Sequence, residues 1–306
     1  MTRGIGHAPI PRCHMTTAAT LRRITPYLLV GFPIVILFVL VAYPMLYNVN
    51  LSLHNTRGEF VGLHNFARVF DDPTFGAALQ ATAIYVVLAV GTELLLGLAL
   101  ALYIHRTIAN ATVRALVYVL LIVPMVTPPV VAGVIARLMY TPNYGIINSI
   151  LRGLGLIHKD ILWLSTGPTA MFSVLSVDIW QWTPFVFLVC FAGLQAVPQD
   201  VVEASKVDGA GGWNLFRLIE FPYLKSLLLL LVIFRFTDTF RVFDHVLVLT
   251  AGGPGAATEF ISVYLYRVAF KFFDLGYAAA IGFYVVIVTS VLFSRLSRWL
   301  ATEGVM

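Results

Sequence analysis

Charged side chains interrupt a long apolar stretch of this sequence, where they are unfavourable unless they are paired or hydrated. Four of them follow one another after Pro222 at intervals of three residues: Arg235, Asp238, Arg241 and Asp244. Ionisable residues in such stretches usually face the interior of a helix bundle or a water-filled cavity. The four residues therefore predict either a polar binding site or a ladder of structural ion pairs, Arg235 with Asp238 and Arg241 with Asp244.

Two predicted helix faces carry groups that suit a polar organic ligand. Each face has residues at i, i+3, i+4 and i+7, the spacing that places four side chains on one stripe of a helix. The residues are Asp178, Gln181, Trp182 and Phe185 on the first face, and Arg235, Asp238, Thr239 and Val242 on the second. Carboxylate and amide groups pair with hydroxyls and aromatic rings stack on C–H faces, so this chemistry suits a sugar. We expect Asp178 to lie in a wet cavity without a protein partner, and Trp182 to stack on the sugar ring.

The composition indicates that the bilayer is the solvent of this chain. Of its 306 residues, 59% are apolar and only 11% are charged, against roughly 25% charged in an ordinary soluble domain. This excludes a soluble globular enzyme. The formal net charge of +5 is spread out, with no basic cluster denser than Arg22-Arg23, which argues against a nucleic-acid partner. The two cysteines, Cys13 and Cys190, indicate neither a disulfide framework nor a metal site.

Six transmembrane helices are predicted, which makes the fold class all-α integral membrane. A span needs roughly 20 apolar residues, and charges mark its limits. The predicted spans lie between Arg23 and Arg57, at 75–104, between Arg114 and Arg137, between Asp178 and Asp200, after Pro222, and between Asp274 and Arg295. Glu93 is the one charge within 75–104, and we expect it either to hold a proton or cation or to bond a neighbouring helix.

The predicted organisation has no soluble domain. An N-terminal segment, 1–25, precedes a transmembrane domain, 26–298, and a tail, 299–306, follows it; either Met1 or Met15 is the start. With the N-terminus inside, eleven Lys and Arg residues flank the inner ends of the spans and six lie in the outer loops. Because the inner loops of membrane proteins hold the excess of Lys and Arg, both termini are predicted to be cytoplasmic.

The inner loop at 196–222 is predicted to form a helix, a turn and a second helix. Pro198 favours a helix start and Gly209 permits the positive φ that a turn requires, while Asp208 is expected to cap the second helix. A short exposed amphipathic helix suits a groove on a partner protein, although the loop can also be a plain connection.

Several motifs resemble one family. Glu203-Ala204-Ser205, Asp208-Gly209, Ile219 and Pro222 resemble the EAA loop of ABC-importer permeases, with Ser205 and Phe221 departing from the usual Ala and Leu. Three further stretches resemble the maltose-type, carbohydrate-uptake branch of that family: Trp180-x-x-x-Pro184-Phe185, Leu249-Thr250-Ala251-Gly252-Gly253-Pro254, and Phe60-Val61-Gly62-Leu63-His64-Asn65-Phe66 with Asp72-Pro73-x-Phe75.

The resemblance implies a binding-protein-dependent ABC importer permease that translocates a sugar, an oligosaccharide or disaccharide, and has no enzymatic activity. It implies that the loop docks on an ATPase through Glu203, Ala204, Ser205, Asp208 and Gly209, and that sugar contacts fall on the two stripes. The implied partners are a second permease subunit, two ATPase subunits that bind ATP and Mg, an extracytoplasmic sugar-binding protein and membrane lipid. No cofactor is expected on this chain.

Three alternatives stay open at this point. A polyol or glycerol phosphate can replace the sugar, because side chains on the two stripes differ from the maltose pattern. A secondary transporter driven by Glu93 or the charges after Pro222 is a rival of another class, although no inverted repeat supports it. A membrane-embedded enzyme that uses Asp178 and Asp238 is the third.

Overall fold

All regular structure in the described part of the chain is helical. The computed structural model describes residues 27, 29–108 and 110–302, so the predicted segment 1–25 and the end of the predicted tail, 303–306, lie outside it. Within those residues a single antiparallel bridge joins His54 and Phe60. The elements, in chain order, are η1 (Phe38–Ala42), α2 (Tyr43–Ser52), α3 (His64–Asp71), α4 (Pro73–Thr107), α5 (Ala111–Val126), α6 (Pro129–Met139), α7 (Ile146–Gly153), α8 (Gly167–Gln195), α9 (Gln199–Val207), α10 (Gly212–Leu215), η2 (Phe216–Glu220), α11 (Phe221–Thr239), α12 (Asp244–Leu249), α13 (Ile261–Phe270) and α14 (Leu275–Thr302).

Four helices in the described residues are long and apolar enough to cross a membrane. They are Leu29–Ser52, which ends with α2, and then α4, α8 and the Leu275–Arg295 part of α14. A bent pair, α5 and α6, can form a fifth span. Helix α11 occupies the place of the remaining predicted span and has 19 residues, but it includes Lys225, Arg235 and Asp238. The all-helical membrane architecture is therefore confirmed, while the count of six stays a prediction.

The predicted third span corresponds to two helices in the structure. Helices α5 and α6 meet at a bend of 94°. Thr127 between them is extended, with φ −67° and ψ 125°. Two prolines follow it, and a residue before proline is pushed out of the helical region, so Pro128 and Pro129 account for the break.

The predicted fifth span is wrong at its end. Helix α11 stops at Thr239, so Arg241 and Val242 lie in the following connection. Asp244 opens the separate helix α12 as its first residue. A carboxylate is favourable in the first turn of a helix, where the helix dipole is positive. Val242 therefore does not share a helical stripe with Arg235.

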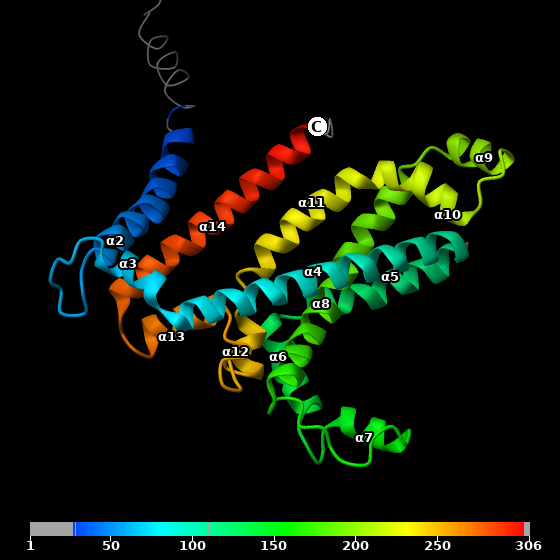
Figure 1. Ribbon diagram of the computed structural model, residues 1–306. Helices are drawn as coiled ribbons and strands as arrows, with labels where there is room; N and C mark the ends of the chain where they lie inside the picture. The colour runs from blue at the N-terminus through cyan, green and yellow to red at the C-terminus, as the bar shows by residue number, and fades with distance from the viewer. Residues whose placement is uncertain (1–26, 28, 109, 303–306) are drawn as a thin grey trace, which may run out of the picture.

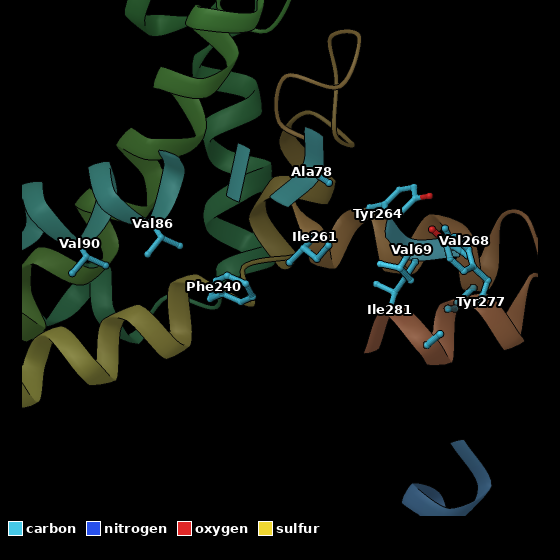
Figure 2. Close-up of a cluster of buried hydrophobic side chains, with 13 residues drawn as sticks. Val69, Ala78, Val86, Val90, Phe240, Ile261, Tyr264, Val268, Tyr277 and Ile281 are labelled. Carbon is cyan, nitrogen blue, oxygen red and sulfur yellow. The ribbon is translucent and has the colours of Figure 1, made fainter. Parts of the chain in front are cut away.

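Close packing around α4 holds the bundle together. A Cβ on Gly97 of α4 would lie 2.6 Å from Val186 of α8, so glycine is required where these two helices meet. A separate apolar cluster joins α3, α4, α13 and α14 around side chains such as Val69, Val86 and Ile281, as Figure 2 shows. In Figure 1, α9 and α10 lie toward the same side of the molecule as the end of α14, and α7 lies at the opposite end.

Candidate functional site

The centre of the bundle holds a guanidinium surrounded by three carboxylates. Arg235 of α11 and Glu93 of α4 are both 0% exposed, and they form two parallel bonds, Nε to Oε2 at 2.7 Å and Nη2 to Oε1 at 2.8 Å. Arg235 Nη2 also lies 3.2 Å from Oδ2 of Asp178 on α8, and Nη1 lies 2.6 Å from Oδ2 of Asp238. The cluster thus ties three helices together through one side chain.

Glu93 is the member of this cluster that the sequence did not assign to the site. Its expected bond to a neighbouring helix is present, and the partner is Arg235. The position of Glu93 within an apolar span did indicate that it needs a cationic partner, because a charge buried in an apolar bundle requires an opposite charge. Their separation of 142 positions left the pairing undetermined.

Contrary to the prediction, Asp178 does not lie in a wet cavity and does have a protein partner. The residue is 2% exposed, and its carboxylate accepts a bond from Arg235. Helix α8 begins at Gly167, well before the predicted limit of this span, which places Asp178 at mid-helix among other helices. Asp238 is the member that reaches the surface, with 40% of its side chain exposed.

Aromatic rings border the exposed edge of the cluster. The Arg235 guanidinium lies over the ring of Trp182, 4.4 Å from its centroid. Phe185 contacts Trp182 edge to face at 6.0 Å and Phe234 of α11 at 5.3 Å. Arg235 therefore covers one face of the Trp182 ring, and a sugar can stack only on the other face.

Two of the predicted site residues keep buried polar atoms without a partner. Gln181 donates from Nε2 to the carbonyl of Thr127 at 2.6 Å, but its Oε1 has no hydrogen-bond partner in the described structure. Thr239 Oγ1 is buried and likewise unpartnered there. Both atoms can accept a bond from a hydroxyl group.

The predicted ladder of ion pairs is half right. Arg235 pairs with Asp238, whereas the structure shows no ion pair between Arg241 and Asp244 in the residues it describes. Arg241 Nε instead donates to the carbonyl of Thr237 at 3.3 Å. Val242 is half-buried against the apolar cluster that contains Leu249 and takes no part in the polar site.

The loop after α8 forms the predicted helix, turn and helix. Helix α9 starts directly after Pro198, and Gly209 has a φ of +82°, a region that residues with a Cβ rarely adopt. Glu203 and Ala204 are exposed, and the hydroxyl of Ser205 donates to the carbonyl of Val202 at 2.8 Å.

Asp208 does not cap the second helix of this loop, contrary to the prediction. It is the C-cap of α9, and the N-cap of α10 is Gly211, which offers no side chain. The turn has three residues, Gly209 to Gly211, so Asp208 lies too far from the first amides of α10 to accept their bonds.

A second polar cluster lies where α4 starts, at the end away from this loop. Asp72, the N-cap of α4, accepts hydrogen bonds from the hydroxyls of Tyr264 and Tyr277, the latter at 2.5 Å. Burial raises the pKa of Asp72, but these hydrogen bonds outweigh it and hold the pKa below its usual value. Arg68 of α3 pairs with Asp274 at 2.7 Å and lies 3.9 Å from the Tyr277 ring centroid.

Comparison with known proteins gives the family. Residues 93–302 match the model of the binding-protein-dependent transport system inner membrane component family. The chain belongs to this family. The match includes the loop at 196–222, and the family carries the EAA motif. Members are permease subunits of ABC transporters without enzymatic activity, so the rival assignments as a secondary transporter or an enzyme are excluded.

Individual relatives agree with this assignment. The chain is 36% identical to a probable ABC transporter permease protein of Sinorhizobium fredii, y4oQ, over 86% of this chain and 82% of that protein. It is 35% identical to the trehalose/maltose transport system permease protein MalF of Thermococcus litoralis, over 87% and 88%. A crystal structure of a bacterial ABC transporter involved in alginate import shares its fold, with a TM-score of 0.80, 20% identity, and coverage of 92% and 97%.

Family membership fixes the general role of this chain. It is a multi-pass membrane protein that works with a binding protein and an ATPase as part of an ABC importer. The predicted family and fold class are confirmed.

Proposed function

We propose that this permease imports a sugar, a disaccharide or an oligosaccharide, by way of the polar face that α8 and α11 present. The supporting observation is a half-exposed carboxylate, Asp238, that shares the guanidinium of Arg235 with the partly exposed Trp182, whose ring contacts Phe185, within an otherwise apolar bundle. The carboxylate suits sugar hydroxyls and the rings suit sugar C–H faces. The trehalose/maltose permease among the relatives supports the same substrate class.

Within this face, direct contacts and positioning fall to different residues. Asp238, Trp182 and Phe185 have exposed surface for the sugar, and the buried acceptors of Gln181 and Thr239 lie on the same two helices. Asp178 and Arg235 are buried, so in this state they position Asp238 and Trp182 rather than touch the ligand. Val242 lies outside this face.

The ligand charge is expected to be neutral. Glu93, Asp178 and Asp238 place three carboxylates around the single guanidinium of Arg235, and Arg241 adds a further cation that interacts with Asp238. Excess negative charge repels a phosphate. Glycerol phosphate is therefore the less favoured alternative, and a polyol, which is neutral, is the stronger one.

In the proposed assembly, the loop at 196–222 and both chain termini lie on the cytoplasmic side of the membrane. The excess of Lys and Arg on that side supports this orientation, and the end of α14 lies toward the same side as α9 and α10 (Figure 1). Glu203 is exposed on α9, as a residue that docks on an ATPase must be. Two ATPase subunits, which bind ATP and Mg, a second permease subunit and an extracytoplasmic sugar-binding protein complete the transporter.

Substitutions on α8 and α11 test the sugar face. Trp182→Ala and Asp238→Asn should leave the yield of the assembled transporter intact and reduce sugar uptake, by about 10- to 100-fold for Asp238→Asn if binding at the site limits uptake. Trp180→Ala is the matched control, because Trp180 is 48% exposed on the same helix and lines a different cavity, beside Ala136 and Tyr140 of the α6 region. Uptake that is unchanged in Trp182→Ala and Asp238→Asn would remove the assignment.

A further inference from the structure

A polar cavity lies where the end of α4, the start of α5 and the loop at 196–222 meet. Its volume is about 550 Å³, within the range of roughly 300–1,000 Å³ typical of ligand sites. Its charged and titratable lining residues are His105, Arg106, Arg114, Lys206 and Glu220. None of them belongs to the cluster around Arg235, so this is a separate feature of the molecule.

Positive charge dominates this cavity. Three permanent cations face one carboxylate, and that carboxylate is already engaged, because Glu220 Oε2 accepts a bond from Arg106 Nη2 at 2.5 Å. Glu220 is buried, whereas Lys206 is exposed and has no acidic partner in the described residues. The Nδ1 atom of His105 is buried without a hydrogen-bond partner in that part of the chain. The cavity therefore offers the ammonium group of Lys206 and an unused ring nitrogen to an anion.

The helix α9 divides its charges between two faces. Gln199, Val202 and Lys206 line the cavity at i, i+3 and i+7. Asp200 and Glu203 are not among the lining residues, so the acidic face points elsewhere. One face of α9 is thus available to a partner through Glu203 while the other presents a lysine to the ends of α4 and α5.

We propose that this cavity binds a phosphate group, either the headgroup of an anionic lipid or free phosphate, and that the bound group holds α9 against the ends of α4 and α5. Apolar side chains in the same lining, Ile108, Leu194 and Val197, suit the acyl chains of a lipid. Basic pockets at the cytoplasmic edge of membrane helices bind anionic lipid headgroups. The inference rests on the proposed function only in placing α9 on the cytoplasmic side.

Binding to the purified complete transporter tests the site, in neutral detergent without sugar or ATP. Inorganic phosphate is titrated calorimetrically in one arm, and retention of short-chain phosphatidylglycerol is measured by native mass spectrometry in the other. The ATPase subunits can themselves bind phosphate, so the quantity that counts is the difference between wild type and Lys206→Gln. We expect Lys206→Gln to weaken binding about tenfold or more in at least one arm, and Lys206→Arg to retain it.

Arg217→Gln is the matched control, because Arg217 is exposed on the same loop and does not line the cavity. A loss in the phosphatidylglycerol arm alone identifies a lipid headgroup, and a loss in the phosphate arm alone identifies a free anion. Equal binding by wild type and Lys206→Gln in both arms, or an equal loss in Arg217→Gln, would overturn the proposal. Since no sugar is present, either result is independent of whether the permease transports a sugar.

Discussion

Replacing Arg235 by glutamine is expected to destabilise the helix bundle more than any other single change in the charged cluster. The substitution leaves Glu93 and Asp178, which are 0% and 4% exposed at their side chains, without a cation. Breaking a buried ion pair from one side costs about 3–5 kcal/mol, a large part of a total stability of roughly 5–15 kcal/mol. The unfolded fraction should rise by roughly two to four orders of magnitude, so little assembled transporter should accumulate.

Other substitutions in the cluster should cost less stability than Arg235→Gln, and their costs should follow a defined order. Glu93→Gln leaves Arg235 paired with Asp178 and Asp238, so the cost should be about 1–3 kcal/mol. The double variant Glu93→Gln/Arg235→Gln removes one stranded carboxylate and should recover part of the stability lost by Arg235→Gln, with a coupling of about 0.5–3 kcal/mol. Arg241→Gln is the control, since Arg241 is exposed and a surface change of this kind stays within about 0.5 kcal/mol.

Thermal unfolding of the detergent-purified transporter measures this order. The thiol of Cys190 is fully buried in α8 and becomes reactive to a maleimide dye only when the helices separate; a Cys13→Ser background removes the other thiol. Yield and midpoint temperature should rank wild type and Arg241→Gln first, Glu93→Gln next, the double variant third and Arg235→Gln last. An Arg235→Gln protein as stable as wild type, or a double variant no better than Arg235→Gln, would refute the structural role of the cluster.

Three further results are expected. Glu203→Ala should leave membrane insertion intact and lower ATPase association and uptake, measured by co-purification, whereas Asp200→Ala on the same helix should not; equal co-purification of both variants with wild type would disprove the coupling role. Gly209→Val should reduce uptake and sugar-stimulated ATP hydrolysis, because its φ of +82° costs a β-branched residue about 1–3 kcal/mol, while Gly211→Val, at φ −69°, should be tolerated; identical coupling in the two variants would contradict this. Asp72 has a folded-state pKa below its usual value, so the stability that its carboxylate contributes is present above the unfolded-state pKa and is lost as pH falls through the folded-state pKa. Asp72→Asn should therefore lower the unfolding temperature at pH 7, and the decrease should be smaller below a pH of about 4. A decrease that is the same at every pH would argue against this role of the carboxylate.

The sequence predicts the membrane segments of this chain more accurately than it predicts the ends of the helices. Long gaps between charges located α4, α8 and α14, because a charge at the bilayer centre is strongly unfavourable. The ends of α11 and α5 were missed for different reasons. For α11, no glycine or proline between Thr239 and Asp244 marks the end of the helix, although Asp244 is a typical helix-start residue. For α5, the Pro128-Pro129 pair is a signal for the break before α6, but the apolar residues continue across it and favour one span.

The residue types of the site were predictable from the sequence, but their partners were not. Periodicity placed Asp178 with Gln181 and Arg235 with Asp238, since each pair lies on one helix. The bond from Arg235 to Glu93 depends on how α4 and α11 pack, which local spacing does not encode. The bond from Arg235 to Asp178 likewise depends on how α11 packs against α8, and it reverses the role expected of Asp178, from an open acceptor for a ligand to a buried member of an ionic cluster.

Transport by the reconstituted complex tests the central claim most directly. Proteoliposomes that hold this permease with its partner subunits, ATP inside and the binding protein outside should accumulate a neutral disaccharide or oligosaccharide, and the accumulation should stop without ATP or the binding protein. Trp182→Ala should lower that uptake and Trp180→Ala should not. Uptake driven by an ion gradient in the absence of ATP, or ATP-dependent uptake of glycerol phosphate with no uptake of any neutral sugar, would contradict the account.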